Sequence, residues 1–216
     1  LEHGKRAQPG VEPVDAPHIL VADTTKALND LGRAARARTD ATIIAVTGSV
    51  GKTTVKETLY TALERGAQDR VHRSVKSYNN HTGVPLSLAR MPADSRFGVF
   101  EMGMNHAGEI ADHTRLARPH VAIINTIASA HIEHLGSMEA IADAKAEVFE
   151  GLEPGGTAII PFDSPYYDRL RAAAERAGAR VVTFGLGEGA DARVTYHVPT
   201  AAGTLATAKI GDAQLS

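Results

Sequence analysis

The sequence contains no cysteine, so its 216 residues can form neither a disulfide nor a thiolate metal site. No apolar run is long enough to span a bilayer, and residues 1–10 are polar and lack the apolar core of a secretory signal. The 23 basic and 25 acidic residues leave a formal charge of −2, which gives no general attraction to nucleic acid or to an anionic membrane. These absences favour a soluble cytoplasmic protein that binds neither nucleic acid nor a membrane. The content of 43% hydrophobic and 22% charged residues is typical of a globular domain.

Two catalytic signatures are also absent. The sequence has no Gly-x-Ser-x-Gly elbow and no cysteine, and therefore offers no evident nucleophile for covalent catalysis. It has no Asn-Lys-x-Asp guanine motif, which would be expected in a GTPase switch. There is no internal repeat and no low-complexity segment.

A glycine-containing loop at residues 47–54 is the most informative pattern that is present. It follows the apolar run 42–46 and leads into a helical pattern at 52–65, the order that a phosphate-binding loop requires. Backbone N–H groups and the helix N-terminus would face phosphate oxygens, Lys52 would add a full charge, and the Thr53 hydroxyl would ligate Mg²⁺. We therefore predict that ATP or GTP binds here. The predicted nucleotide-binding residues are Gly48, Ser49, Val50, Gly51, Lys52, Thr53 and Thr54.

The spacing inside this loop differs from that of the common P-loop. Only Ser49 and Val50 separate Gly48 from Gly51, where the common pattern has four residues before its Gly-Lys pair. The alternative is a strand-to-helix turn that carries Gly-Lys by chance. The agreement of strand, glycines, lysine, threonines and helix favours phosphate binding.

The chain alternates between apolar strands and amphipathic helices. Strands are predicted at 42–46, 97–101, 121–125, 157–160 and 180–184, and helices at 52–65, 83–90, 106–117, 137–151 and 164–177. This alternation predicts an α/β fold, a mostly parallel P-loop-type sheet with helices on both faces. Alternating patterns at 194–198 and 204–210 add a short antiparallel β segment near the C-terminus.

The segment before the loop is predicted differently. Residues 1–18 carry three prolines and read as a linker. A short strand is expected at 19–22, and Asp23 or Thr24 is expected to cap the helix that follows.

Polar residues follow two of the predicted strands. Glu101 ends one strand and is placed to reach the Mg²⁺ at the loop, or else to stabilise the N-terminus of the next helix. His131 lies past the end of another strand and is either a metal ligand or a hydrogen-bonded core group. Lys145 interrupts a helical apolar stripe and is most simply an exposed lysine.

Five segments resemble, in order, the motifs of the Mur ligases of peptidoglycan synthesis, and most closely those of the type that adds D-alanyl-D-alanine. The segments are residues 47–54, 78–85, 101–106, 130–137 and 144–147. The two-residue gap inside the loop is itself the Mur-ligase form, and the resemblance covers residues 19–212. It implies a protein of three domains. Residues 1–40 would be a linker and the remnant of the N-terminal substrate domain, residues 41–216 the central ATP-binding domain, and the C-terminal domain would be absent.

The resemblance also implies roles for individual residues. Lys52 would hold the β- and γ-phosphates of ATP, Thr53 and Glu101 a first Mg²⁺, and His131 a second Mg²⁺. Lys145 would be carbamylated by CO₂, and the anionic carbamate would bind the second Mg²⁺. Lys52, His131 and Lys145 would thus form the catalytic set. The segment Asn79, Asn80, His81 and Thr82 would face the muramoyl-peptide substrate, and the alternative is a capped turn before a helix that starts near Pro85.

The activity implied by the resemblance is ATP-dependent amide ligation. UDP-MurNAc-tripeptide would be activated as an acyl phosphate and joined to D-Ala-D-Ala, with both molecules as partners. Other Mur-type ligases and folylpolyglutamate synthetase share the loop and the metal residues, and a non-catalytic P-loop nucleotide-binding module is a third hypothesis. The Asn79-Asn80 pair and the string at residues 101–106 favour the D-Ala-D-Ala type.

Overall fold

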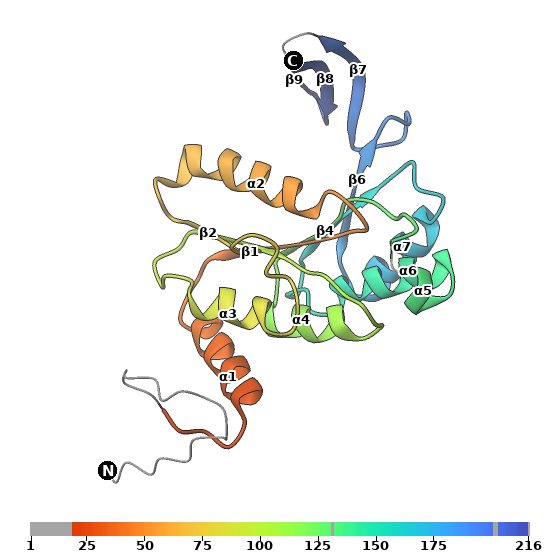
Figure 1. Ribbon diagram of the computed structural model, residues 1–216. Coiled ribbons are helices and arrows are strands. Elements are labelled where there is room, and N and C mark those ends of the chain that lie inside the picture. Colours follow the sequence, from red (N-terminus) through yellow and green to blue (C-terminus); the bar gives the residue numbers. More distant parts are fainter. Residues whose placement is uncertain (1–18, 131, 201–202, 216) are drawn as a thin grey trace.

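The computed structural model describes residues 19–130, 132–200 and 203–215 (Figure 1). The linker predicted for residues 1–18 and the candidate metal ligand His131 lie outside the described residues. Both therefore stay predictions.

One nine-stranded sheet runs through the described part of the chain, in the order β2-β3-β1-β4-β5-β6-β7-β8-β9. Its parallel strands are β1 (Thr42–Thr47), β2 (Val71–Arg73), β3 (Phe97–Glu101), β4 (Val121–Ile124), β5 (Thr157–Pro161) and β6 (Arg180–Gly185). The strand β7 (Ala192–Thr200) pairs parallel to β6, and β8 (Gly203–Ile210) and β9 (Ala213–Leu215) follow antiparallel. The predicted fold class, including the antiparallel segment, is confirmed.

Helices cover the parallel strands on both faces (Figure 1). The helix α2 lies on one face, and α3, α4, α6 and α7 lie on the other. The helices are α1 (Thr24–Ala37), α2 (Lys52–Ala67), α3 (Gly83–Ala89), α4 (Glu109–Ala117), α5 (Ile132–Leu135), α6 (Met138–Ala146) and α7 (Tyr167–Arg176), and the 3-10 turn η1 (Glu147–Phe149) follows α6. No helix among the described residues is long and apolar enough to cross a membrane.

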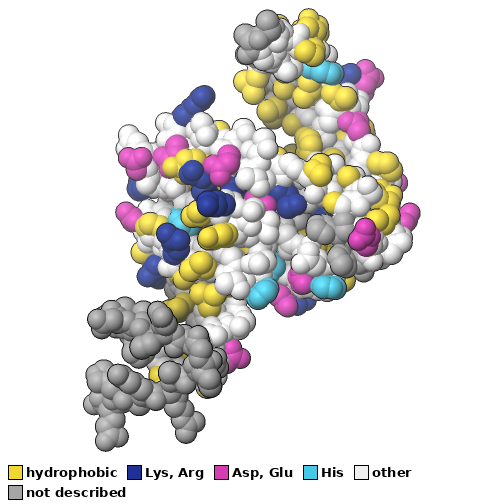
Figure 2. Space-filling view, in the orientation of Figure 1, with side chains coloured by type: hydrophobic (Ala, Val, Ile, Leu, Met, Phe, Trp, Pro, Cys, Tyr) yellow, Lys and Arg dark blue, Asp and Glu magenta, His cyan; other side chains and the backbone are white. Residues whose placement is uncertain are grey.

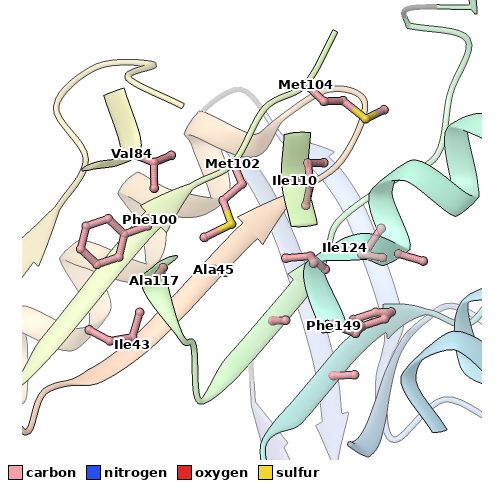
Figure 3. Close-up of a cluster of buried hydrophobic side chains, with 14 of the residues drawn as sticks. Ile43, Ala45, Val84, Phe100, Met102, Met104, Ile110, Ala117, Ile124 and Phe149 are labelled. Carbon is pink, nitrogen blue, oxygen red and sulfur yellow. The ribbon is translucent and has the colours of Figure 1, made fainter. Parts of the chain in front are cut away.

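The core consists of two layers, one on each side of the sheet. Successive side chains of a strand point to opposite faces, so Ile43 and Ala45 of β1 join the cluster with α3 and α4, whereas Ile44 and Val46 join the cluster under α2. Figure 3 shows the first cluster, in which Phe100 lies among side chains from several elements. Burial on both faces explains why β1 reads as a continuous apolar run.

The register of the strands brings the predicted site to one edge of the sheet. The strand β1 lies between β3 and β4, with Val46 opposite Glu101 and Thr47 opposite Ile124. The loops that leave these three strands therefore begin side by side, at the edge where ligands bind in sheets of this kind.

Some predicted boundaries are wrong. Residues 19–22 form no strand, and the side chains of Ile19 and Leu20 are exposed because no neighbouring strand covers them. The helix expected at 106–117 begins only at Glu109, after Gly108 adopts a left-handed conformation with φ of 91°. The helix expected at 137–151 ends at Ala146 and continues as the 3-10 turn. The three-residue strand β2 was too short for its pattern to be seen.

Candidate active site

The loop between β1 and α2 has the backbone conformation of a ligand cradle. Gly48 and Gly51 have positive φ values of 149° and 78°, which other residues adopt only under strain. Gly51 precedes α2 directly, and no side chain caps this helix N-terminus. The N–H groups of the first turn of α2 therefore face outward together with the positive end of the helix dipole. This arrangement fits the phosphates of a nucleotide.

Asn125, just past the end of β4, holds this loop from the neighbouring strand. Its Nδ2 donates a hydrogen bond to the Val50 carbonyl at 2.6 Å, and its Oδ1 lies against Gly48. A β-carbon at Gly48 would come within 1.6 Å of that oxygen, so only glycine fits there. The sequence analysis did not single out Asn125. A polar residue directly after a buried strand next to β1 was the signal that could have found it.

Ser49 connects the loop to the segment after β4. Its backbone N–H donates to the Thr126 carbonyl at 2.9 Å. Its hydroxyl donates to the Ala128 carbonyl at 2.9 Å and accepts from the Ala128 N–H at 2.8 Å. Ser49 thus shapes the loop, while Val50 and Thr54 are exposed.

Lys52 lies across the mouth of the loop. Its Nζ donates to the Gly48 carbonyl at 2.8 Å, and burial lowers its pKa while the Glu101 carboxylate acts in the opposite direction. The ammonium group is therefore held where phosphate oxygens would meet the loop.

Glu101 is the point at which three chain segments meet. Its carboxylate is almost fully buried, at 1% exposure. Thr53 of α2 donates its hydroxyl to Oε2 at 2.8 Å, and Asn79 of the β2–α3 loop donates its side-chain amide to Oε1 at 2.6 Å. The alternative role, stabilising the N-terminus of the next helix, is excluded because α4 begins eight residues later, at Glu109.

The donor set around Glu101 fits a magnesium ion. Mg²⁺ prefers hard oxygen ligands and is usually held by one or two carboxylates together with substrate phosphates. Thr53 and Glu101 provide a hydroxyl and a carboxylate 2.8 Å apart, beside the phosphate-binding loop. Within the described residues, no three or more His, Cys, Asp or Glu side chains form a separate metal cluster.

The segment 79–82 divides into two parts. Asn79 belongs to the Glu101 network, and its carbonyl also accepts the Gly103 N–H at 2.8 Å. Asn80 forms a capped turn before α3, where its Oδ1 accepts from the N–H groups of Thr82 at 3.2 Å and Gly83 at 2.8 Å. His81 and Thr82 are exposed. The turn thus presents His81 and Thr82 to solvent beside the site.

Lys145 is buried, at 1% exposure, and the expectation of an exposed lysine is wrong. It follows Ile141 and precedes Phe149 by one helical turn each, and both neighbours are buried at 0% and 1% exposure. That spacing of four residues was visible in the sequence. Burial, with a smaller contribution from the charge of Lys52, lowers the pKa of Lys145 to about 8. Among the described residues, no hydrogen bond or ion pair holds its ammonium group.

Lys56 is a second buried lysine, which the sequence analysis did not single out. It lies on α2 one turn after Lys52 and has 0% exposure. Its Nζ is 3.9 Å from Oε2 of Glu101. A lysine within an otherwise regular helix offers no sequence signal for this placement.

Comparison with known proteins decides the family. The family model described as "Mur ligase middle domain" matches residues 46–214. The chain belongs to the Mur ligase family. This Mur ligase chain is 44% identical over 147 residues to the UDP-N-acetylmuramoyl-tripeptide–D-alanyl-D-alanine ligase of Bacillus subtilis, covering 68% of this chain and 32% of the relative. It is 38% identical over 151 residues to the Escherichia coli protein of the same name, covering 70% and 33%. The chain thus spans about a third of the length of these curated relatives.

Solved structures agree with the family. A crystal structure of MurF from Acinetobacter baumannii superposes with a TM-score of 0.85 at 33% identity, covering 94% of this chain and 44% of the other. MurF ligase from Thermotoga maritima, solved in complex with ADP, gives a TM-score of 0.81 at 29% identity, covering 95% and 47%. The folylpolyglutamate synthetase of L. casei, at 16% identity and a TM-score of 0.69, shares the fold.

Proposed function

We propose that this chain is the ATP-binding part of a ligase that joins D-Ala-D-Ala to UDP-MurNAc-tripeptide. The observation that carries the proposal is the Glu101 carboxylate, which accepts hydrogen bonds from Thr53 of the nucleotide-binding helix and Asn79 of the candidate substrate loop. One buried group thereby joins the two places where the reactants would meet. The names of the curated relatives, at 38–44% identity, support the choice of substrates.

In this proposal the β1–α2 loop binds ATP. The backbone around Gly48 and Gly51 and the N-terminus of α2 hold the phosphates, and Lys52 contacts the β- and γ-phosphates. The neighbour in complex with ADP supports a nucleotide at this fold. Val50 and Thr54, being exposed, would line the nucleotide from outside the loop.

Two Mg²⁺ ions complete the proposed site. Thr53 and Glu101 would hold the first ion, and His131 with a carbamate on Lys145 would hold the second. When bound, the ions supply positive charge that stabilises the phosphoryl oxygens during transfer. The lowered pKa of Lys145 supports the carbamate, because only the neutral amine attacks CO₂. The product gains a negative charge and loses one proton to solvent.

The reaction then proceeds by transfer of the γ-phosphoryl group. The terminal carboxylate oxygen of the tripeptide bonds to the γ-phosphorus while the bond to the β-phosphate oxygen breaks, which gives an acyl phosphate and ADP. The amine of D-Ala-D-Ala then attacks the acyl carbon, phosphate leaves, and the amine loses a proton. Lys52 offsets the charge on the phosphoryl oxygens, and Asn79 with its loop orients the tripeptide beside Glu101.

Activity of the full-length protein that contains this chain tests the proposal. Phosphate release should require ATP, Mg²⁺, UDP-MurNAc-tripeptide and D-Ala-D-Ala together. Lys145→Ala should nearly abolish it, and a short carboxylic acid should partly restore it by occupying the position of the carbamate. Lys26→Ala, on the exposed side of α1, is the control. Full activity of the Lys145→Ala protein would contradict the role of the carbamate.

A narrower function as a nucleotide-binding module is the second hypothesis. It predicts ATP binding by this chain with no phosphate release under any combination of substrates in the full-length protein. Another amino acid or peptide that replaced D-Ala-D-Ala as acceptor would instead indicate a different ligase of the same family.

A further inference from the structure

Lys56 is a buried charge to which the proposed function gives no role. Its side chain has 0% exposure and is among the largest that are fully buried. An ammonium group inside a protein is strongly unfavourable unless its donors are all paired. The contacts of Lys56 therefore indicate what the lysine is for.

The ammonium group of Lys56 makes two hydrogen bonds and two ion pairs near the site. Its Nζ donates to the backbone carbonyl of Ser74 at 2.9 Å and to that of Lys76. The same atom lies 3.2 Å from Oε1 of Glu57 and 3.9 Å from Oε2 of Glu101. The two carbonyls begin the β2–α3 loop, so Lys56 fastens this loop to the nucleotide-binding helix.

The same loop is attached to Glu101 at two further points. The hydroxyl of Ser74 accepts the backbone N–H of Glu101 at 3.2 Å, and Asn79 donates to the Glu101 carboxylate at 2.6 Å. Lys76 has a left-handed φ of 51°, a conformation that needs support from its surroundings. Lys56 supplies that support through the Lys76 carbonyl.

We propose that Lys56 is a positioning residue that holds residues 74–82 and the Glu101 carboxylate in one arrangement with the nucleotide-binding helix. Occupancy of the nucleotide site and the conformation of residues 74–82 are coupled through Lys56. This proposal deepens the proposed function, and its coupling to the nucleotide rests on the proposed binding of Mg²⁺ by Glu101. The attachment of the loop to Lys56 stands independently of that function.

Lys56→Met tests the proposal, because methionine keeps the length of the side chain and removes the charge and the donors. Lys26→Met is the matched control on an exposed surface. Hydrogen exchange is followed at the bonded amides of Ser74, Tyr78 and Gly103, whose partners are given by the structure. Exchange at these amides should accelerate at least tenfold in Lys56→Met, while the bonded amides of Asn125 and Thr157 change less than twofold. A merely structural lysine would accelerate both sets equally or neither, which would overturn the proposal.

Nucleotide binding gives the second measurement. Calorimetric titration with a non-hydrolysable ATP analogue is done with Mg²⁺ and with a chelator. In Lys56→Met, the factor by which Mg²⁺ increases the affinity should be at least tenfold smaller than in the parent. The affinity measured in chelator should stay within twofold of the parent. An unchanged Mg²⁺ gain would overturn the coupling. A parent protein that binds no analogue would refute the proposed function, and the exchange comparison would still decide the role of Lys56.

If Lys56→Met does not fold, the parent protein decides. Binding of the Mg²⁺ analogue complex should then slow exchange at Ser74 and Tyr78 at least fivefold. Unchanged exchange at both amides on saturation would overturn the proposal.

Discussion

Two regions of the molecule, the surroundings of the β1–α2 loop and the strands β7 to β9, depart from ordinary burial in opposite directions. Beside the β1–α2 loop, the charged residues Lys56, Glu101 and Lys145 are buried at 1% exposure or less. Along the β7–β9 hairpin, apolar side chains such as Leu205 and Leu215 are 53% and 56% exposed. Figure 2 shows hydrophobic side chains on the surface of this part of the molecule.

The difference separates residues that stabilise the fold from residues that the fold positions for chemistry. Buried charges destabilise a domain unless they are paired, so their concentration at one edge of a well-packed core indicates chemistry. Exposed apolar groups cost little in the domain itself and add little to it. We therefore expect substitutions in the two regions to differ sharply in their effects.

The largest effect is expected from the core beside the site. Phe100 of β3 is fully buried between helices and strand neighbours. Phe100→Ala should lower the free energy of unfolding by about 3–5 kcal/mol, because it removes a large apolar side chain and leaves a cavity. Urea denaturation measures the loss. A loss below about 1 kcal/mol would mean that the parallel part of the sheet is not a tightly packed core.

The next effect concerns binding at the same edge. Lys52→Ala should weaken binding of an ATP analogue by about 100-fold, which equals about 2.7 kcal/mol, since it removes the cation at the mouth of the loop. Calorimetric titration measures the affinity. Equal affinities of variant and parent would exclude Lys52 as the phosphate-binding lysine.

The third prediction concerns the effect of the buried charge of Lys145 on the free energy of unfolding. Its pKa in the folded protein, about 8, is below its ordinary value of 10.5. Between these two pH values the unfolded chain binds more protons than the folded chain, so the contribution of Lys145 to stability rises with pH. Below about pH 8 the burial of its charge destabilises the fold. Lys145→Met should therefore raise the free energy of unfolding by on the order of 2 kcal/mol at pH 7.

The pH dependence identifies the cause. The advantage of Lys145→Met over the parent should shrink steadily from about pH 8 upward and be lost above the ordinary pKa of 10.5. Urea denaturation in CO₂-depleted buffer keeps the amine unmodified. An advantage that is independent of pH would attribute the effect to packing and not to the buried charge.

The sequence predicted the parts of this molecule that depend on local pattern. The β1–α2 loop and Glu101 at the end of β3 follow from strand, turn and helix signals that lie within a few residues. The burial of Lys145 could have been predicted from its spacing of four residues to Ile141 and Phe149, but the usual preference of lysine for the surface pointed the other way. Lys56 could not be predicted, because its partners lie in a loop that only the fold brings to it. Asn125 offered the signal of a polar residue directly after a buried strand, but its bond to Val50 depends on the fold.

The smallest effect is expected at the hairpin, and one substitution made at two positions sharpens the comparison. Leu205 of β8 lies opposite Val198 of β7 and is 53% exposed, whereas Leu170 of α7 is fully buried. Leu205→Ala should change the free energy of unfolding by about 0.5 kcal/mol or less, since most of the side chain is already in water.

Leu170→Ala, the matched control, should cost about 2–5 kcal/mol because it opens a cavity. Denaturation of both variants under the same conditions measures the difference. If Leu205→Ala cost as much as Leu170→Ala, the apolar surface of the hairpin would have to be covered in solution. The contrast between the two regions would then hold for the single chain and not for the protein in solution. If a second copy covers the apolar surface, the change in the free energy of unfolding would depend on protein concentration.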